Sequence, residues 1–180
     1  MTQIFFEKST GESYQQISTA AHSLLKKELA RFLSLDADEV VIAKDEKGCP
    51  YVEGKKDIFI SISHCDGYIM CAFSDDKIGV DVELVKKRRK SVESRVFTDA
   101  EISLLNKSEN EDRAFYTLWT LKESYLKAIG TGFADNAKDV EFYSLELPIK
   151  SNKSEYTFTV GERDGFVYSV CEKKVYLKSI

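Results

Sequence analysis

The chain has 180 residues, a length typical of one domain, with 43% hydrophobic and 31% charged residues, as in ordinary globular proteins. The formal net charge of −4 argues against a general nucleic-acid-binding protein, which usually carries a basic excess. Residues 86–95 stand apart, because they alone carry a net charge of +5. The four cysteines form no CxxC pair, and no signal peptide or membrane-spanning run is visible. We therefore expect a cytoplasmic protein with reduced thiols and no nucleic-acid or membrane partner.

The first half of the chain has the pattern of one helix followed by antiparallel strands. Apolar residues recur at helical spacing between Ser13 and Leu33, and Cys65-Asp66-Gly67 fits a hairpin turn. In chain order, the predicted elements are a strand at 4–6, a helix at 13–33, a strand at 40–43, a turn at 45–50 and strands at 58–63, 68–74 and 78–85.

The second half repeats the order of helix and strands. Thr98 and Glu101 form a capping box that opens a short helix, and Gly130 and Gly132 supply the stop of a longer one. The further predicted elements are a loop at 86–90, a helix at 112–129, strands at 140–145, 156–160, 166–171 and 175–177, and a turn at 161–165. The order predicts an α+β fold of two similar halves, residues 1–85 and 86–180.

The segment Ile78–Leu84 carries the first candidate site. Side chains alternate along a strand, so Gly79, Asp81 and Glu83 share the face opposite the apolar residues. With Gly79 leaving open space beside them, the two carboxylates could bridge a hard cation such as Mg²⁺. The alternative is the solvent face of an amphipathic strand, which the pattern by itself favours.

Glu123 and Lys127 are the second candidate pair. They are four residues apart in the longer helix and so lie on one face. The functional interpretation is a third metal carboxylate with a lysine for phosphate binding or proton transfer. The alternative is an ion pair that only stabilises the helix.

Ser63 and His64 end a predicted strand at a turn. His64 is either a hydrogen-bonded turn residue or a hydrogen-bond donor to a phosphate. The other histidine, His22, lies on the polar face of a helix. The chain has no G-x-S-x-G elbow, Walker A motif, GxGxxG motif or zinc-ligand spacing. Serine hydrolases, P-loop enzymes and zinc proteins are therefore disfavoured.

Together these segments resemble the Sfp-type 4′-phosphopantetheinyl transferases, of the holo-acyl-carrier-protein synthase superfamily. The resemblance extends from about His22 to Gly132, and Asp81 and Glu123 lie 42 positions apart. The matching motifs are Ser63-His64, Ile78-Gly-Val-Asp-Val-Glu83, Phe97-Thr-Asp-Ala-Glu101 and Trp119-Thr-Leu-Lys-Glu-Ser-Tyr-Leu-Lys127.

The resemblance implies transfer of 4′-phosphopantetheine from coenzyme A to a serine of an apo acyl or peptidyl carrier protein, with release of 3′,5′-ADP. It implies coenzyme A in a cleft between the halves and Mg²⁺, or alternatively Mn²⁺, as the metal. The two-half organisation predicts a monomer, because one chain supplies both walls of the cleft. The implied metal ligands are Asp81, Glu83 and Glu123. The implied catalytic residues are Glu123 as base and Lys127 on the leaving phosphate. The implied coenzyme A contacts are Ser63, His64, Lys122 and Lys127.

Two positions depart from the family pattern. Gly48-Cys49-Pro50 stands where Gly-Lys/Arg-Pro is common, so Lys47 is the candidate replacement for the basic residue, and His22 stands about where many members have arginine. These departures motivate an alternative from another class, a non-catalytic module that binds coenzyme A or a carrier protein. An unrelated Mg²⁺ phosphodiesterase is a third interpretation. Carrier proteins of this kind are typically acidic, so Lys86–Lys90 or Arg95 is predicted to assist their association, with a solvated loop of no such role as the alternative.

Overall fold

The computed structural model describes residues 1–11, 13–131 and 137–174. The helices are α1 (Tyr14–Leu33), α2 (Lys90–Val96), α3 (Asp99–Lys107) and α4 (Glu111–Ile129), with 3₁₀ turns η1 (Ala37–Glu39) and η2 (Ala137–Asp139). The strands are β1 (Thr2–Lys8), β2 (Ile42–Lys44), β3 (Pro50–Val52), β4 (Phe59–Cys65), β5 (Tyr68–Ser74), β6 (Ile78–Leu84), β7 (Tyr156–Arg163) and β8 (Phe166–Lys173).

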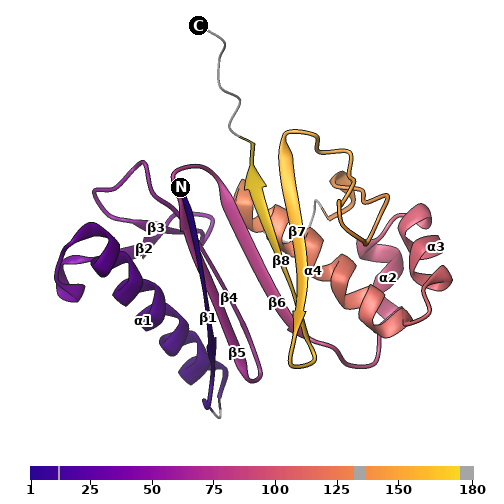
Figure 1. Ribbon diagram of the computed structural model, residues 1–180, viewed down its shortest axis with the longest axis horizontal. Helices are drawn as coiled ribbons and strands as arrows, with labels where there is room; N and C mark the ends of the chain where they lie inside the picture. The colour runs from indigo at the N-terminus through magenta and orange to yellow at the C-terminus, as the bar shows by residue number, and fades with distance from the viewer. Residues whose placement is uncertain (12, 132–136, 175–180) are drawn as a thin grey trace, which may run out of the picture.

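Two helix-covered antiparallel sheets make up most of the molecule (Figure 1). The first has the order β1-β5-β4 and packs against α1, where Leu25 and Leu29 are buried in one cluster with Phe73. The second has the order β6-β8-β7 and packs against α4. The α+β prediction is therefore confirmed, while the similarity of two halves stays a prediction.

The two sheets meet where β6 lies beside β4. The Val80 N–H donates to Ser61 Oγ at 3.0 Å, and the Val82 N–H donates to Ser63 Oγ at 3.3 Å. Serine hydroxyls thus take the place of a regular strand ladder at this seam and satisfy backbone donors that would otherwise be buried without a partner. The arrangement places β4 and β6 in parallel register, nineteen positions apart.

The helix ends follow from local sequence chemistry. Ser13 caps α1 in a reciprocal capping box with Gln16, and Thr98 caps α3 in the same way with Glu101. Gly130 ends α4 with φ of 70°, in the left-handed region that glycine adopts without strain. Gly132, the other predicted stop, and the strand predicted at 175–177 lie outside the described residues.

Other predictions need correction. Residues 140–145 form no strand; they make only an isolated bridge between Phe142 and Ser151. The loop predicted at 86–90 runs into α2, which begins at Lys90. The turn predicted at 161–165 is shorter than expected, because β7 continues to Arg163.

Gly79 does not leave open space beside the carboxylates, as the sequence interpretation assumed. A Cβ atom at this position would lie 1.8 Å from Ser124 O and 2.6 Å from Ala128 N, both in the backbone of α4. Glycine therefore lets α4 approach β6 closely. This approach brings the helix carboxylate Glu123 toward the strand carboxylates, which makes Gly79 part of the construction of the site.

The hydrogen bonding of β6 bears on the predicted division at residues 85 and 86. β6 precedes that boundary, yet it pairs with β8 from the C-terminal part of the chain. The pairing argues for a boundary before β6, and the division itself remains a prediction. None of the helices in the described residues has the length and apolar character needed to cross a bilayer.

Candidate functional site

Asp81 occupies the centre of the site. It lies on β6 with 4% of its surface exposed, between β4 and α4. Its Oδ1 atom accepts two bonds of 2.7 Å, one from the Ser63 hydroxyl and one from the Lys127 amino group. Its Oδ2 atom is buried and has no hydrogen-bond partner among the described residues. An ionised carboxylate with one unpartnered oxygen is costly to bury, so the site calls for a further cation or donor.

The negative charge of Asp81 also acts on the neighbouring carboxylates of Glu83 and Glu123. Burial, and then repulsion from Asp81, raises the pKa of Glu83 to about 7. The same two causes raise the pKa of Glu123 to about 7, with Lys127 opposing and Glu83 adding to the rise. Near neutral pH, each side chain is therefore ready to accept or release a proton.

Two basic side chains, Lys127 and His64, lie near the carboxylates. The Lys127 amino group also donates to Val80 O at 3.1 Å, so it bridges α4 and β6. His64 is half-buried, with the ring of Tyr14 packed edge-on at a centroid distance of 4.7 Å. Burial lowers the pKa of His64, and the charges of Lys127 and His22 lower it further.

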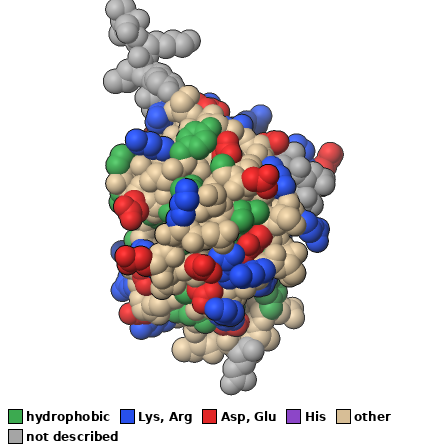
Figure 2. Space-filling view, turned by 90° about the vertical axis from the view of Figure 1, so that its right-hand side faces the viewer, with side chains coloured by type: hydrophobic (Ala, Val, Ile, Leu, Met, Phe, Trp, Pro, Cys, Tyr) green, Lys and Arg blue, Asp and Glu red, His purple; other side chains and the backbone are tan. Residues whose placement is uncertain are grey.

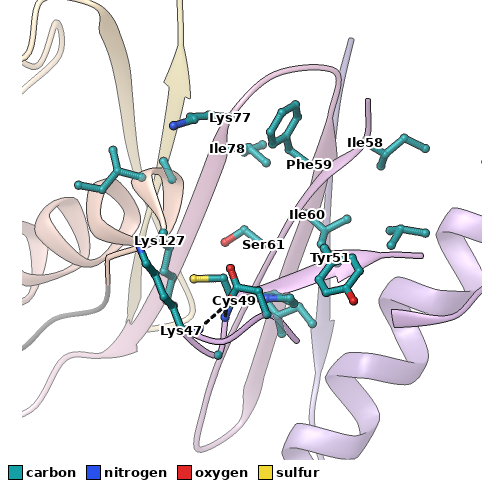
Figure 3. A pocket seen from close by; sticks show the side chains of 18 of the residues that line it. Lys47, Cys49, Tyr51, Ile58, Phe59, Ile60, Ser61, Lys77, Ile78 and Lys127 are labelled. Carbon is teal, nitrogen blue, oxygen red and sulfur yellow. Dashed lines mark hydrogen bonds between the residues drawn. The ribbon is translucent and has the colours of Figure 1, made fainter. Parts of the chain in front are cut away.

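A cavity of about 740 Å³ opens beside this centre (Figure 3). Its walls come from the segment 45–62, from the start of β6 and from the last two turns of α4. Glu123, Lys127 and Ser61 line it together with the predicted contact Lys47. The cavity has the volume for a nucleotide-sized ligand, which would lie next to Glu123 and Lys127.

The donor set fits a hard divalent cation. Carboxylate oxygens are the ligands that Mg²⁺ takes in proteins, and the unpartnered Oδ2 atom of Asp81 marks where positive charge is lacking. Within the described ranges, no group of three or more His, Cys, Asp and Glu side chains stands in an arrangement that could hold a metal. Asp81, Glu83 and Glu123 are thus side chains of the type that binds Mg²⁺, but in the described residues they do not stand in a metal-binding arrangement.

The family model for the 4′-phosphopantetheinyl transferase superfamily matches residues 77–174, more than half of the chain. The chain belongs to this superfamily. The matched segment starts just before β6 and contains Asp81, Glu83, Glu123 and Lys127, so it includes the carboxylate centre described above.

Several individual proteins similar to the chain are named 4′-phosphopantetheinyl transferases. The chain is 31% identical to the 4′-phosphopantetheinyl transferase Sfp of Bacillus subtilis (strain 168), over 82% of this chain and 70% of Sfp. It is 36% identical to the 4′-phosphopantetheinyl transferase gsp of Aneurinibacillus migulanus, over 61% of this chain and 46% of gsp. It is also 31% identical to another 4′-phosphopantetheinyl transferase of Bacillus subtilis, over 69% of this chain and 60% of that protein. The chain thus spans about half to two thirds of the length of these superfamily members.

Of the predicted coenzyme A contacts, Lys47 and Lys127 line the cavity, whereas Ser63 and His64 are not among its lining residues. Lys122 also lies outside the lining. Its side chain is completely buried, and its amino group donates to Ala137 O at 2.7 Å and Val140 O at 2.6 Å and pairs with Glu101 Oε2 at 2.9 Å. All three donors of the amino group are thereby used. We therefore assign Lys122 a structural role in the C-terminal part of the superfamily fold, in place of a phosphate contact.

Ser63, which was predicted to contact coenzyme A, forms its hydrogen bonds within the protein. Its hydroxyl hydrogen goes to Asp81, and its oxygen accepts from the Val82 backbone. In this arrangement Ser63 orients a carboxylate oxygen at the seam between the sheets. The coenzyme A contact assigned to it remains a prediction.

The sequence interpretation missed Arg89 and Ser61. The Arg89 guanidinium lies over the Trp119 ring at 4.9 Å, and its charge lowers the pKa of Glu83. Arg89 was counted only as one member of a basic run, and nothing in the sequence signals its partner thirty positions away. Ser61 differs in this respect, because its spacing of two from Ser63 places both hydroxyls on one face of the strand.

The raised pKa values predict a pH-dependent effect of Glu83→Gln. A carboxyl whose pKa is higher in the folded than in the unfolded protein makes folding less favourable as pH rises from about 4.5 to about 7, and the penalty persists above that range. The substitution should therefore raise the melting temperature of the metal-free protein at pH 8 by about 3–6 °C. At pH 4 the glutamate is protonated in the folded state and mostly protonated in the unfolded state, so the two melting temperatures should nearly coincide.

The melting temperatures of variant and wild type must be compared at each pH, because His22 and His64 change the stability of both proteins with pH in the direction opposite to Glu83. Burial lowers both of their pKa values, which favours the folded state as pH rises. Scanning calorimetry of both proteins across this pH range measures the difference. An equal shift at every pH would contradict the raised pKa of Glu83.

Proposed function

We propose that the chain transfers 4′-phosphopantetheine from coenzyme A to a serine hydroxyl of an apo acyl or peptidyl carrier protein and releases 3′,5′-ADP. The observation that carries this proposal is the position of Asp81, Glu123 and Lys127 at the side of a nucleotide-sized cavity with lysines in its wall. Anion-binding lysines beside carboxylates are the combination that phosphoryl transfer requires. Membership of the superfamily and the names of its relatives support the same activity.

In the proposed reaction, the carrier serine oxygen forms a bond to the phosphorus that bears pantetheine. The bond from that phosphorus to the bridging oxygen of the diphosphate breaks, and the electron pair leaves with 3′,5′-ADP. Glu123 accepts the serine proton, a role that suits a carboxyl with a pKa of about 7. The Lys127 amino group offsets the charge that develops on the leaving phosphate.

Asp81, Glu83 and Glu123 are the residues that would hold Mg²⁺, with Mn²⁺ as the alternative. When bound, the ion supplies charge neutralisation for the diphosphate. Ser63 and Lys127 already orient Asp81. We propose His64 and Lys47 as further contacts to coenzyme A, since Lys47 lines the cavity and His64 lies within range of the Lys127 charge.

Mass spectrometry tests the proposal. The protein is incubated with coenzyme A, Mg²⁺ and either an apo acyl carrier protein or an apo peptidyl carrier domain, and we expect addition of one phosphopantetheine group to the carrier serine. A parallel reaction without coenzyme A is the control. Tight binding of coenzyme A with no modification of either carrier, in Mg²⁺ or Mn²⁺, would instead establish the non-catalytic binding module.

We further propose that the protein is cytoplasmic. We also propose that it acts as a monomer, because the described residues of one chain line the cavity. The basic run offers less free charge to a carrier than its sequence indicates. Arg88 is buried and pairs with Glu93 and Glu111, both at 2.9 Å, and Lys86 and Lys87 lie within 3.5 Å of aspartates. On the face that carries α2 and α3, Lys and Arg side chains are mixed with Asp and Glu (Figure 2). Arg89, Lys90 and Arg95 thus remain the candidates for carrier association.

A further inference from the structure

A buried hydrogen bond between two serines joins α4 to the sheet beneath it. The Ser169 hydroxyl, on β8, donates to Ser124 Oγ at 2.9 Å, and the Ser124 hydroxyl donates to Leu121 O within α4 at 3.0 Å. Neither serine is exposed to solvent. Breaking this bond would leave buried polar atoms without a partner, which is costly, so the bond resists a shift of α4 along the sheet.

The strand register places Ser169 beside the centre of the site. In the antiparallel pairing of β6 and β8, Ser169 is directly opposite Asp81. Residues directly opposite each other on neighbouring strands point to the same face of a sheet. That face is the one that α4 covers (Figure 1), because the Lys127 amino group reaches Asp81 from this helix. Ser169 therefore holds α4 from the strand next to Asp81.

The same turn of α4 also contacts β6. A Cβ atom at Gly79 would lie 1.8 Å from Ser124 O, so the Ser124 backbone rests against β6 while its hydroxyl bonds to β8. Gly79 permits the close approach but does not fix the helix in any direction along the sheet. The hydrogen bond from Ser169 is directional, because its strength falls steeply as the angle at the hydrogen decreases. The two contacts together fix the height and the lateral position of this turn.

The functional side chains of α4 lie on either side of this fixed turn. Glu123 directly precedes Ser124, and Lys127 follows it by three residues, which is less than one helical turn. The Lys127 amino group donates to Asp81 Oδ1 at 2.7 Å and to Val80 O at 3.1 Å. A helix shift of about 1 Å would lengthen such bonds beyond the range of good hydrogen bonds. The meeting of α4 with the strand carboxylates thus depends on where Ser124 is held.

We propose that Ser169 is a positioning residue, which acts through Ser124 to hold Glu123 and Lys127 in register with Asp81. The inference rests on the proposed function, in which Asp81 and Glu123 hold the metal ion and Lys127 offsets the charge of the leaving phosphate. Ser169 belongs to none of the motifs that connect the chain with its superfamily, and it does not line the cavity. Its effect on the site is therefore indirect.

Mn²⁺ binding, measured by electron paramagnetic resonance without coenzyme A or carrier, tests the assignment. The proteins compared are the wild type, Ser124→Ala, Ser169→Ala and the double variant. Each single variant should bind Mn²⁺ about tenfold more weakly, the smaller end of the losses seen when a group that supports metal ligands is removed. The double variant should bind no more weakly than either single variant, because each substitution removes the same hydrogen bond.

Thr120→Val is the matched control. Thr120 is a completely buried residue of the same helix, but its hydroxyl donates to Thr117 O at 3.0 Å, within α4, and not to the sheet. Valine keeps the shape of threonine and removes only the hydroxyl. Thr120→Val should therefore bind Mn²⁺ within about twofold of the wild type. Circular dichroism should show that all of these variants are folded.

Unchanged Mn²⁺ affinity in Ser169→Ala, an equal loss in Thr120→Val, or losses that add in the double variant would overturn the assignment. So would a wild type that binds no Mn²⁺, because Ser169 would then have no metal ligands to position. In the transfer reaction, Ser169→Ala should lower kcat about tenfold and leave KM for the carrier within about twofold, whereas a rise in KM alone would contradict a positioning role.

The metal-binding measurement separates this inference from the proposed function. A protein that shows the expected Mn²⁺ affinities but modifies no carrier would support the role of Ser169 and contradict the transfer. Carrier modification by the wild type, with no effect of Ser169→Ala on Mn²⁺ binding, would support the transfer and overturn the role of Ser169.

Discussion

Asp81→Asn is expected to lower the rate of phosphopantetheine transfer at least about 100-fold, the scale of losing one preorganised electrostatic contact in an active site. The substitution keeps the size of the side chain and removes its charge. Asp81 is the common partner of Ser63 and Lys127, and its charge contributes to the raised pKa values of Glu83 and Glu123. Transfer to an apo carrier, followed by mass spectrometry over time, measures the loss.

The folded state should survive this change. Asparagine still accepts a hydrogen bond from the Ser63 hydroxyl, and repulsion within the carboxylate group decreases when one charge is removed. Circular dichroism and the melting temperature at pH 8 should therefore show a folded protein. Asp66→Asn is the matched control, because it removes an exposed aspartate that pairs with Lys86 at 3.4 Å and should leave transfer unchanged. Full activity of Asp81→Asn would contradict the mechanism.

The sequence predicted well those parts of the fold that depend on local chemistry. The periodic apolar residues of α1 and α4, the capping boxes at Ser13 and Thr98 and the left-handed stop at Gly130 each act within a few residues. Strands β5 and β6 were found for the same reason, since short runs of apolar and alternating residues are local signals.

The errors arose where distant residues decide the structure. The basic run at 86–90 looked like a solvated loop, but Arg88 turns inward and pairs with Glu93 and Glu111, which ties the start of α2 to the start of α4. The segment 140–145 has strand-like composition but no neighbouring strand to pair with, apart from the single bridge at Phe142. Local composition contains no information about such partners.

The same distinction applies to the site. Helical spacing correctly places Glu123 and Lys127 on one face, and alternation correctly places Gly79, Asp81 and Glu83 on another. The backbone of α4, lying against Gly79, is what brings these two faces together, and no local pattern reports that approach. Lys122, next to Glu123 in sequence, points to a different part of the molecule because adjacent helical positions differ by about 100°.

Lys122→Met is expected to destabilise the protein by about 3–5 kcal/mol, the cost typical of removing one member of a buried ion pair. Its partner Glu101 is also completely buried, so the remaining carboxylate would lose its counter-charge. Glu101 keeps its bonds from the backbone N–H groups of Thr98 and Phe142, at 2.8 and 2.9 Å, and these would not offset the lost ion pair. Urea unfolding monitored by circular dichroism measures the change in the free energy of unfolding.

The double variant Glu101→Gln/Lys122→Met should recover part of this stability, because no unpaired charge then remains buried. Lys107→Met is the surface control, since Lys107 is exposed near the end of α3 and its replacement should cost less than about 0.5 kcal/mol. Below its melting temperature, Lys122→Met should bind coenzyme A as tightly as the wild type, because the lysine lies away from the cavity. Normal stability together with weakened coenzyme A binding would instead show that Lys122 faces a phosphate, and the structural role assigned to its pair with Glu101 would be wrong.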